Sequence, residues 1–240
     1  ARKKHNGENL KIFIIPQLTR IGDIVCSTPV LRAIKAKYPN SQISVLASLN
    51  ASSIVKNNPR IDEVIIFEEY KENFLSLIKK IRESNFDCGL SLSGTALSSL
   101  LFFFGLIPCR MKIVRNKKPI AEMLTDWMCN KKEKYTQLSY LPAFYLKMLR
   151  HIGIESIDDK KEVFSSDESR RRINLFLEKE SVFTKDKIVG ISVTAGNKIK
   201  EWGDEKFAIV AKEIVRRHDL KIIFAGGARD EDRINRLIEK

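Results

Sequence analysis

The first half of the chain alternates short apolar runs with stretches whose apolar residues recur at helical spacing. The apolar runs, which have the length and composition of buried strands, lie at residues 10–16, 42–47, 63–67 and 87–92. A helix is predicted after the first strand, ending near Tyr38, and another over residues 71–84, where Leu77, Ile78 and Ile81 share one face. Strands that alternate with helices predict an α/β fold with a parallel, doubly wound sheet.

The pattern changes in the second half. Residues 110–133 are basic and irregular, helical spacing returns over residues 138–152, and residues 153–168 have the polar composition of a linker. A second α/β unit follows, with strands predicted at 187–193 and 220–225 and helices at 169–179, 204–217 and 230–240. We therefore predict an N-terminal Rossmann-like domain over residues 1–165 and the start of a C-terminal domain over residues 166–240. Two strands make a poor independent sheet, so we expect a truncated second domain and a chain that is a fragment.

Composition and charge narrow the possible partners. Apolar residues make up 43% of the chain and charged residues 30%, as in a globular protein. The 43 Lys and Arg exceed the 30 Asp and Glu, which gives a formal net charge of +13. Such a surplus favours anionic partners, namely phosphorylated sugars, anionic lipid or nucleic acid. No nucleic-acid-binding motif is present, so we do not expect nucleic acid.

Cysteine and histidine usage indicates a reducing compartment and no metal site. The four cysteines form no CxxC pair and are typical of reduced thiols in a cytoplasmic protein. The three histidines are scattered, so we expect neither a metal nor a cofactor. The longest apolar run, residues 96–107, is shorter than the ~20 residues that span a bilayer. Peripheral contact with a membrane stays open.

The first candidate site follows the first predicted strand, at residues 18–23. Ligands bind beyond the carboxyl ends of strands in open parallel sheets, and this loop lies at such an end. Gly22 permits a tight turn there. Asp23 is either the N-cap of the following helix or, if that helix begins at Thr28 and Pro29, a free carboxylate in the loop. The dinucleotide-binding pattern GxGxxG is absent.

The second candidate site, residues 194–202, also follows a strand directly. Small residues in this loop can turn their backbone amides toward an anion, and Lys198 and Lys200 add two positive charges. Such a loop suits a diphosphate whose charge must be neutralised when a bond breaks. The alternative is a solvated basic loop without a ligand.

The third candidate site comes after the last predicted strand, where Gly226 and Gly227 precede acidic residues. A carboxylate at this position can bind a ribose diol. The alternative is the acidic first turn of a helix, which the helix dipole favours. Asp230 and Asp232 also resemble a DxD metal motif, but a helical turn does not converge the several oxygen ligands that a hard cation needs.

Two further segments have alternative interpretations. The apolar run at residues 97–107 is predicted to be a buried helix, the alternative being an exposed patch that docks on lipid. The basic stretch at residues 110–118 is either a solvated loop or a surface that receives an anionic acceptor.

Several of these segments together resemble one family. Residues 20–25 (RIGDIV) and 28–33 (TPVLRA), followed by 58–64 (NPRIDEV), resemble the N-terminal signature of the ADP-heptose:lipopolysaccharide heptosyltransferases, glycosyltransferase family nine. Residues 195–202 (AGNKIKEW) are similar to the start of that family's donor domain. The resemblance covers both ends of the chain and little of its middle.

The resemblance implies a GT-B fold with two Rossmann-like domains that face each other across a cleft. It implies that the N-terminal domain binds a lipopolysaccharide core acceptor and the C-terminal domain binds ADP-heptose. Transfer would be inverting and independent of metal, at the inner face of the bacterial inner membrane, where peripheral contact with anionic lipid is expected. The alternative is a non-catalytic protein on the same fold that binds a sugar phosphate or anionic lipid.

The resemblance also implies roles for single residues, with Asp23 as the general base that a positioned carboxylate can provide. The expected donor-binding residues are Gly196, Asn197, Lys198, Lys200 and Glu231, with Lys200 on the phosphates and Glu231 on the ribose. The expected acceptor-binding residues are Arg20, Gly22, Arg110, Lys112 and Arg115. Two departures from the family are that Gly203 replaces a usual proline and that the later Asp-Thr/Ser-Gly donor motif is missing.

Overall fold

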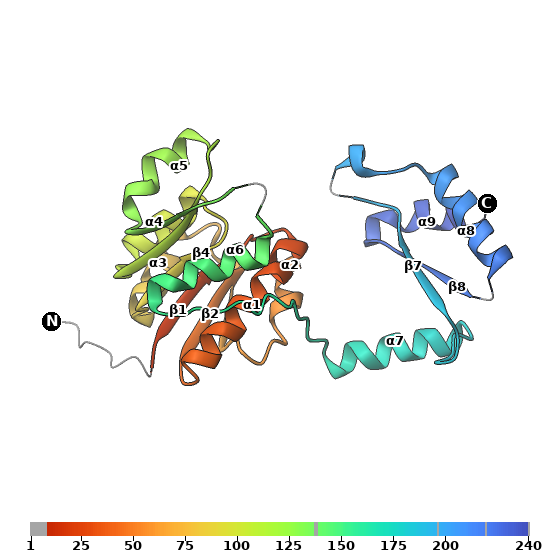
Figure 1. Cartoon of the computed structure of the whole chain (residues 1–240), viewed down its shortest axis with the longest axis horizontal. Coiled ribbons are helices and arrows are strands. Elements are labelled where there is room, and N and C mark those ends of the chain that lie inside the picture. The colour runs from red at the N-terminus through yellow and green to blue at the C-terminus, as the bar shows by residue number, and fades with distance from the viewer. Residues whose placement is uncertain (1–8, 137–138, 196, 219, 240) are drawn as a thin grey trace. The chain divides into compact units, whose positions relative to one another are not determined.

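The computed structural model describes residues 9–136, 139–195, 197–218 and 220–239. These residues fall into two compact units, Ala1–Ser166 and Asp167–Lys240, both of which are drawn in Figure 1. Unit 1 and unit 2 are the names used below for these two parts, and each unit is described by itself.

Unit 1 is built on a six-stranded sheet in the order β3-β2-β1-β4-β5-β6, and every neighbouring pair of strands is parallel. The strands are β1 (Lys11–Ile15), β2 (Gln42–Ala47), β3 (Glu63–Ile66), β4 (Cys88–Ser91), β5 (Cys109–Val114) and β6 (Lys131–Lys134). The helices are α1 (Ile21–Lys37), α2 (Leu49–Val55), α3 (Phe74–Ser84), α4 (Ala96–Phe104), α5 (Ile120–Thr125) and α6 (Leu141–Met148). The parallel α/β fold predicted from the sequence is confirmed.

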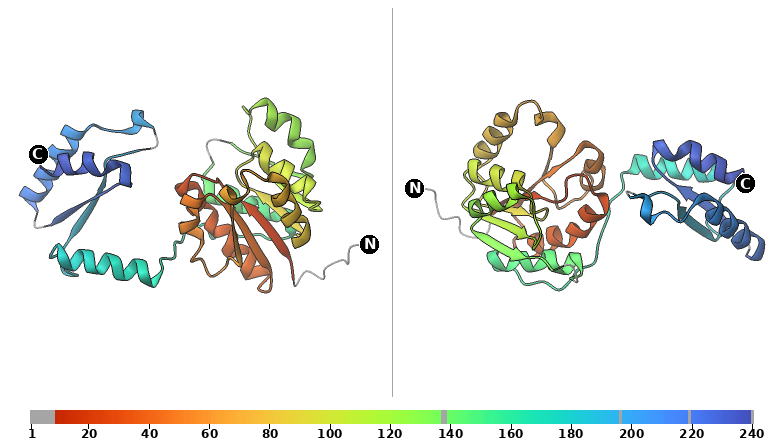
Figure 2. Two further views of the ribbon diagram at one scale, coloured as in Figure 1. Left: turned by 180° about the vertical axis from the view of Figure 1, so that it is seen from behind. Right: turned by 90° about the horizontal axis from the view of Figure 1, so that it is seen from above.

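Helices cover both faces of this sheet, which explains why its central strands are continuously apolar. Ile12 and Ile14 of β1 pack in one cluster with residues of α1 and α6. Phe13 and Ile15, which point to the opposite face, pack in a second cluster with residues of α3 and α4. The view from above in Figure 2 shows helices on either side of the strands.

The middle of the chain differs from the sequence prediction. The region expected to be basic and irregular forms β5, α5, the 3₁₀ turn Asp126–Met128 and β6, so that prediction was wrong. The strand β5 was hidden because Arg110 and Lys112 alternate with its buried Met111 and Ile113. The strand β6 (KKEK) has no apolar residue because it is the exposed edge of the sheet. Residues 97–104 of the apolar run belong to the helix α4, in which Ser98, Ser99, Leu101 and Phe102 are buried and Phe104 is exposed.

The helix predicted to begin at residue 138 is shorter. Residue 138 lies outside the described residues, and α6 runs over Leu141–Met148 before the 3₁₀ turn Leu149–Ile152. The polar stretch that follows, residues 153–168, is held against α1 by ion pairs and a hydrogen bond. Arg32 of α1 pairs with Asp158 at 2.9 Å and with Glu162 at 3.1 Å. The Glu162 amide also donates to the Thr28 hydroxyl at 3.0 Å.

Unit 2 contains a two-stranded parallel sheet of β7 (Ile188–Ser192) and β8 (Lys221–Ala225). Its helices are α7 (Asp167–Lys179), α8 (Asp204–Arg217) and α9 (Glu231–Ile238), and all five elements agree with the sequence prediction to within about two residues at each described end. Its buried core is small: Val193, Ala208 and Leu237 form one cluster, and Ala211 of α8 is also buried. Across the described part of the chain, no helix combines the length and apolarity that a bilayer crossing needs.

Candidate functional site

A cavity of about 650 Å³ opens at the carboxyl edge of the unit 1 sheet. Its lining comes from the loops after four neighbouring strands, β1, β4, β5 and β6, and from the N-terminal ends of α1 and α6. The lining residues are Gln17, Arg20, Asp23, Leu92, Ile113, Arg115, Asn116, Lys117, Tyr135, Thr136, Leu141 and Tyr145. This is the edge where open parallel sheets bind their ligands.

Asp23 reaches this cavity from the first turn of α1. The helix begins at Ile21, its N-cap is Arg20, and Asp23 is its third residue. Both sequence interpretations of Asp23 were therefore wrong, because it is neither the N-cap nor a loop residue ahead of a helix that begins at Thr28. A carboxylate in this turn is favoured by the helix dipole, and 29% of the side chain stays exposed.

The dipeptide Thr28-Pro29 lies inside α1 and does not start it. Proline has no amide hydrogen, so the Val25 carbonyl cannot receive the usual helical bond from residue 29. The Thr28 hydroxyl donates to that carbonyl instead, at 2.8 Å. Gly22 also lies in the helix, with helical backbone in place of the predicted tight turn, and an added Cβ there would meet no atom within 4 Å.

The cavity is cationic. The guanidinium of Arg20 lies 3.9 Å from the Asp23 carboxylate, and most of the Arg20 side chain is exposed. Arg115 follows β5 and donates to the Ser93 carbonyl at 2.9 Å, which fixes it beside the loop after β4. Lys117 is exposed on the same loop. Three positive groups around one carboxylate favour an anionic ligand that also brings a group to Asp23.

Tyr145 forms a buried wall of the cavity. Burial, together with the negative charge of Asp23, raises the pKa of the Tyr145 hydroxyl well above its usual value. The hydroxyl is therefore protonated at neutral pH and can donate a hydrogen bond to a ligand. Leu92, Ile113 and Leu141 add an apolar part to the lining.

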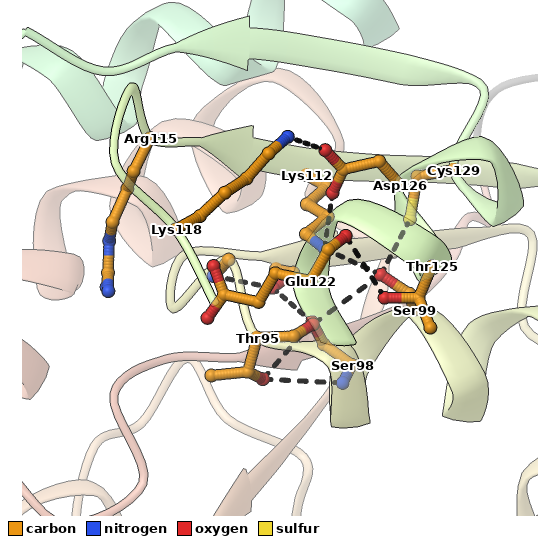
Figure 3. A network of polar contacts seen from close by, with 12 residues as sticks. Thr95, Ser98, Ser99, Lys112, Arg115, Lys118, Glu122, Thr125, Asp126 and Cys129 are labelled. Atoms are coloured by element: carbon orange, nitrogen blue, oxygen red, sulfur yellow. Dashed lines mark hydrogen bonds and ion pairs between the residues drawn. The ribbon is translucent and has the colours of Figure 1, made fainter. Parts of the chain in front are cut away.

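The structure does not bring Lys112 or Arg110 to this cavity. Lys112 has no exposed surface; its ammonium lies 2.9 Å from Asp126 Oδ1 and donates to the Ser99 hydroxyl at 2.9 Å (Figure 3). Arg110 donates to the carbonyls of Met128 and Ile107. The basic stretch predicted as one patch is thus divided, and only its end at Arg115–Lys117 lines the cavity.

Unit 2 presents the second group of predicted residues. Gly196 lies outside the described residues. Asn197 begins a 3₁₀ turn over Lys198–Lys200, its side-chain oxygen accepting from the Ile199 amide at 3.1 Å. Both lysines are exposed. Arg233 of α9 holds the end of this turn, because it pairs with Glu201 at 2.7 Å and with Asp204 at 2.6 Å.

Asp230 holds the segment after β8 in place through hydrogen bonds. Its carboxylate accepts from the Gly227 amide at 2.8 Å and from the Thr194 hydroxyl at 3.1 Å, so it joins the two loops that follow β7 and β8. Gly226 is needed there, because an added Cβ would lie 2.9 Å from the Asp230 Cβ. Glu231 is the exposed first residue of α9.

Several cavity residues were missed in the sequence. Tyr135 and Thr136 follow β6, which no apolar pattern reveals, and Tyr145 comes from a helix far from Asp23 in the chain. Asn116 and Lys117 lie in the basic stretch 110–118, which the sequence already offered as a surface for an anionic acceptor.

Known proteins resemble the chain over most of its length. Residues 74–240 match the sequence profile of glycosyltransferase family 9 (heptosyltransferase). Lipopolysaccharide heptosyltransferase 3 of Escherichia coli K12 is 25% identical over 223 residues, which are 88% of this chain and 62% of that protein. Lipopolysaccharide heptosyltransferase 1 of Campylobacter coli is 24% identical over 225 residues, which are 90% of this chain and 64% of that protein. The chain thus spans less than two thirds of these curated relatives.

Solved structures share the fold. A glycosyl transferase family 9 protein from Veillonella parvula superimposes with a TM-score of 0.80 and 21% identity, over 96% of this chain and 66% of that one. The E. coli ADP-heptose lps heptosyltransferase II gives 0.73 and 19%, over 96% and 68%. E. coli heptosyltransferase WaaC with ADP-2-deoxy-2-fluoro heptose gives 0.69 and 13%, over 96% and 73%. The GT-B type of α/β fold predicted from the sequence is confirmed.

Proposed function

This chain belongs to glycosyltransferase family 9 (heptosyltransferase), and on that premise we propose that it transfers a heptose from ADP-heptose to a hydroxyl group of a lipopolysaccharide core. The donor is proposed because a relative of the same fold is described with an ADP-heptose analogue, and the acceptor because curated relatives are lipopolysaccharide heptosyltransferases. The observation that supports the proposal most directly is the Asp23 carboxylate in a cationic cavity at the ligand edge of the sheet.

We propose that unit 1 binds the acceptor in this cavity. Arg20, Arg115 and Lys117 would bind phosphates or carboxylates of the acceptor, and the Tyr145 hydroxyl would donate a hydrogen bond to it. Lys112 and Arg110 are left out of this set, because their side chains bond to groups inside unit 1.

Asp23 is proposed as the general base. It would accept the proton of the acceptor hydroxyl while that oxygen attacks the anomeric carbon and the bond to the diphosphate oxygen breaks. ADP leaves with the bonding electron pair, and one displacement inverts the anomeric configuration. This role is supported by the position of Asp23, a partly exposed carboxylate beside Arg20 in the cavity at the ligand edge of the sheet.

We propose that unit 2 binds the donor. The exposed Lys198 and Lys200 would neutralise the charge that develops on the leaving diphosphate, with the backbone at Asn197 beside it. Glu231, the first residue of α9 in the segment that follows β8, would accept from the ribose hydroxyls. Gly196 is included in this donor set from the sequence alone.

A transfer assay with the full-length protein tests the proposal. Incubation with ADP-heptose and a lipopolysaccharide core acceptor should release ADP and add one heptose mass to the acceptor. Asp23→Asn keeps the size of the side chain but cannot take up the proton, so kcat should fall by ~10²–10⁴-fold. The control Glu83→Gln removes an exposed carboxylate from α3 and should leave kcat near that of the wild type.

Two outcomes would contradict the proposal. Near-normal turnover of the Asp23→Asn protein would reduce Asp23 to a helix-stabilising residue. Binding of ADP-heptose and acceptor by the wild-type protein without ADP release would favour the non-catalytic binding role on the same fold.

A further inference from the structure

The helix α5 and the 3₁₀ turn after it expose their apolar face, which a surface helix ordinarily buries. Ile120, Met123, Leu124 and Trp127 recur at the i, i+3, i+4 and i+7 spacing of one helical face. Their exposed fractions are 74%, 59%, 68% and 65%. An apolar face of this kind normally packs on the core, so its exposure needs a physical reason.

The reason is that the polar side of this segment faces inward. Glu122 is buried, and Asp126 forms ion pairs with the buried Lys112 and with Lys118 (Figure 3). Lys112 is in turn bonded to Ser99 of α4. Rotating the segment to bury its apolar face would remove Asp126 from Lys112 and leave a buried charge without its partner, which is strongly unfavourable.

The chain segment that carries this apolar face is cationic. The fully described segment 110–136 contains eight basic and three acidic residues. Its acidic residues are withdrawn from solvent, since Glu122 is buried, Asp126 pairs with Lys112 and Lys118, and Glu133 pairs with Arg150. The exposed lysines of the segment are Lys117, Lys131, Lys132 and Lys134.

We propose that the outward face of α5 and the 3₁₀ turn, Ile120, Met123, Leu124 and Trp127, docks on an anionic lipid bilayer. Aliphatic side chains and a tryptophan beside exposed lysines are the combination that binds the interface of anionic membranes. The sign of the surrounding charge favours a lipid surface over a second copy of this basic chain, whose matching face would repel it.

The docking face is continuous with the candidate site. Residues 115–117, which line the cavity, are joined to α5 by only Lys118 and Pro119. Docking would therefore hold the cavity near the lipid surface. The inference stands apart from the proposed transfer reaction, because the binding of lipid requires neither Asp23 nor a donor.

Sedimentation of the full chain with vesicles tests the proposal. Vesicles of phosphatidylcholine mixed with phosphatidylglycerol should bind the wild-type protein. The variant Ile120→Ser/Met123→Ser/Leu124→Ser should bind at least about tenfold more weakly, because burial of each apolar side chain contributes to interfacial binding. The matched control Leu49→Ser/Leu75→Ser/Ile157→Ser removes three similarly exposed apolar side chains elsewhere in unit 1 and should bind like the wild type.

The charged part of the surface is tested separately. Lys131→Gln/Lys132→Gln/Lys134→Gln should weaken binding to these anionic vesicles by about fivefold per charge and leave binding to pure phosphatidylcholine unchanged. Trp127 and Trp202 are the only tryptophans, so a Trp202→Phe protein reports on the docking face alone. Its emission should shift to shorter wavelength when anionic vesicles are added.

Three results would overturn the proposal. Equal vesicle binding by the wild type and the α5 variant would show that this face does not touch lipid. An unchanged Trp127 emission in bound protein would show the same, independently of any effect of the serines on folding. The third result has two parts: the wild type is a dimer without lipid, whereas the α5 variant is a monomer that still binds vesicles. That result would assign the face to self-association.

Discussion

Lys112 shows how one buried charge organises the middle of unit 1. Lysine is almost never fully buried unless it is paired, and here the pairing group is Asp126 with Ser99 beside it. Burial alone would raise the pKa of the Asp126 carboxyl, but the hydrogen bonds from Lys118 and Lys112 outweigh it and hold the pKa below the ordinary value of 3.8. The carboxylate is therefore charged at neutral pH.

Asp126→Asn should destabilise unit 1 at neutral pH, because it leaves the buried Lys112 without a counter-charge. The loss should be of order 3–5 kcal/mol in the free energy of unfolding, measured in urea at pH 7. A carboxyl whose folded pKa is lowered contributes stability that is present above pH 3.8 and lost as the pH falls further. The difference between the variant and the wild type should therefore shrink below pH 3.8.

The control for this prediction removes Lys112 and Asp126 together. Lys112→Met/Asp126→Leu exchanges the buried pair for apolar groups and should recover part of the stability, since buried pairs replaced by apolar residues are often neutral, although Lys118 loses its partner. A pH-independent difference between Asp126→Asn and the wild type would mean that the carboxylate is not stabilised by these lysines.

At the scale of elements, strands that are buried were predicted from the sequence more accurately than strands that are exposed. The strands β1, β2 and β4 are predicted to within one residue, because both faces of each are covered and the runs are apolar. The strand β6 leaves no trace in the sequence, because an exposed edge strand has no face to bury. The cavity was predictable only in part for the same reason. Arg20 and Asp23 follow a visible strand, whereas Tyr135 and Thr136 follow an invisible one.

The end of the loop between β7 and α8 is held by ion pairs to the helix α9. Arg233 of α9 pairs with Glu201 and Asp204, and this arrangement lowers the pKa of the Glu201 carboxyl, chiefly through the hydrogen bond from Arg233. The turn that contains Lys200 therefore has a fixed end, although Lys200 itself is exposed. A preorganised turn binds an anion with less entropic cost than a free loop.

Lys200→Ala should weaken ADP binding by about 10–100-fold, the usual worth of a hydrogen bond to a charged group. The measurement is calorimetric titration with ADP in the full-length protein at low salt. The loss should diminish as salt rises, because added ions screen an exposed charge. Lys212→Ala removes an exposed lysine from α8 and should bind ADP normally. Equal ADP affinity in the Lys200→Ala protein would remove Lys200 from the donor site.

At the scale of the whole chain, the two units differ in how much of each is buried. The sheet of unit 1 packs between two large apolar clusters, one around Ile12 and Ile14 and one around Phe13 and Ile15. In unit 2, four of the described residues are buried, and half-exposed apolar groups such as Phe176 and Val215 line an open groove of about 890 Å³. Local stability follows the burial of apolar contacts, so the two units should open with different free energies.

Hydrogen exchange in the 240-residue chain should separate the units. Amides of β7 and β8 should exchange at least 10²-fold faster, after correction for intrinsic rates, than those of β1 and β4, because the local unfolding of unit 2 exposes less apolar surface. The measurement is exchange monitored by mass spectrometry at neutral pH, with peptides from each strand. Saturating ADP should slow exchange in β7 and β8 and leave β1 unchanged if unit 2 holds the donor site, because a ligand stabilises only the state that binds it. Equal protection of β1 and β7 without ligand would mean that the small core of unit 2 is as stable as the covered sheet of unit 1.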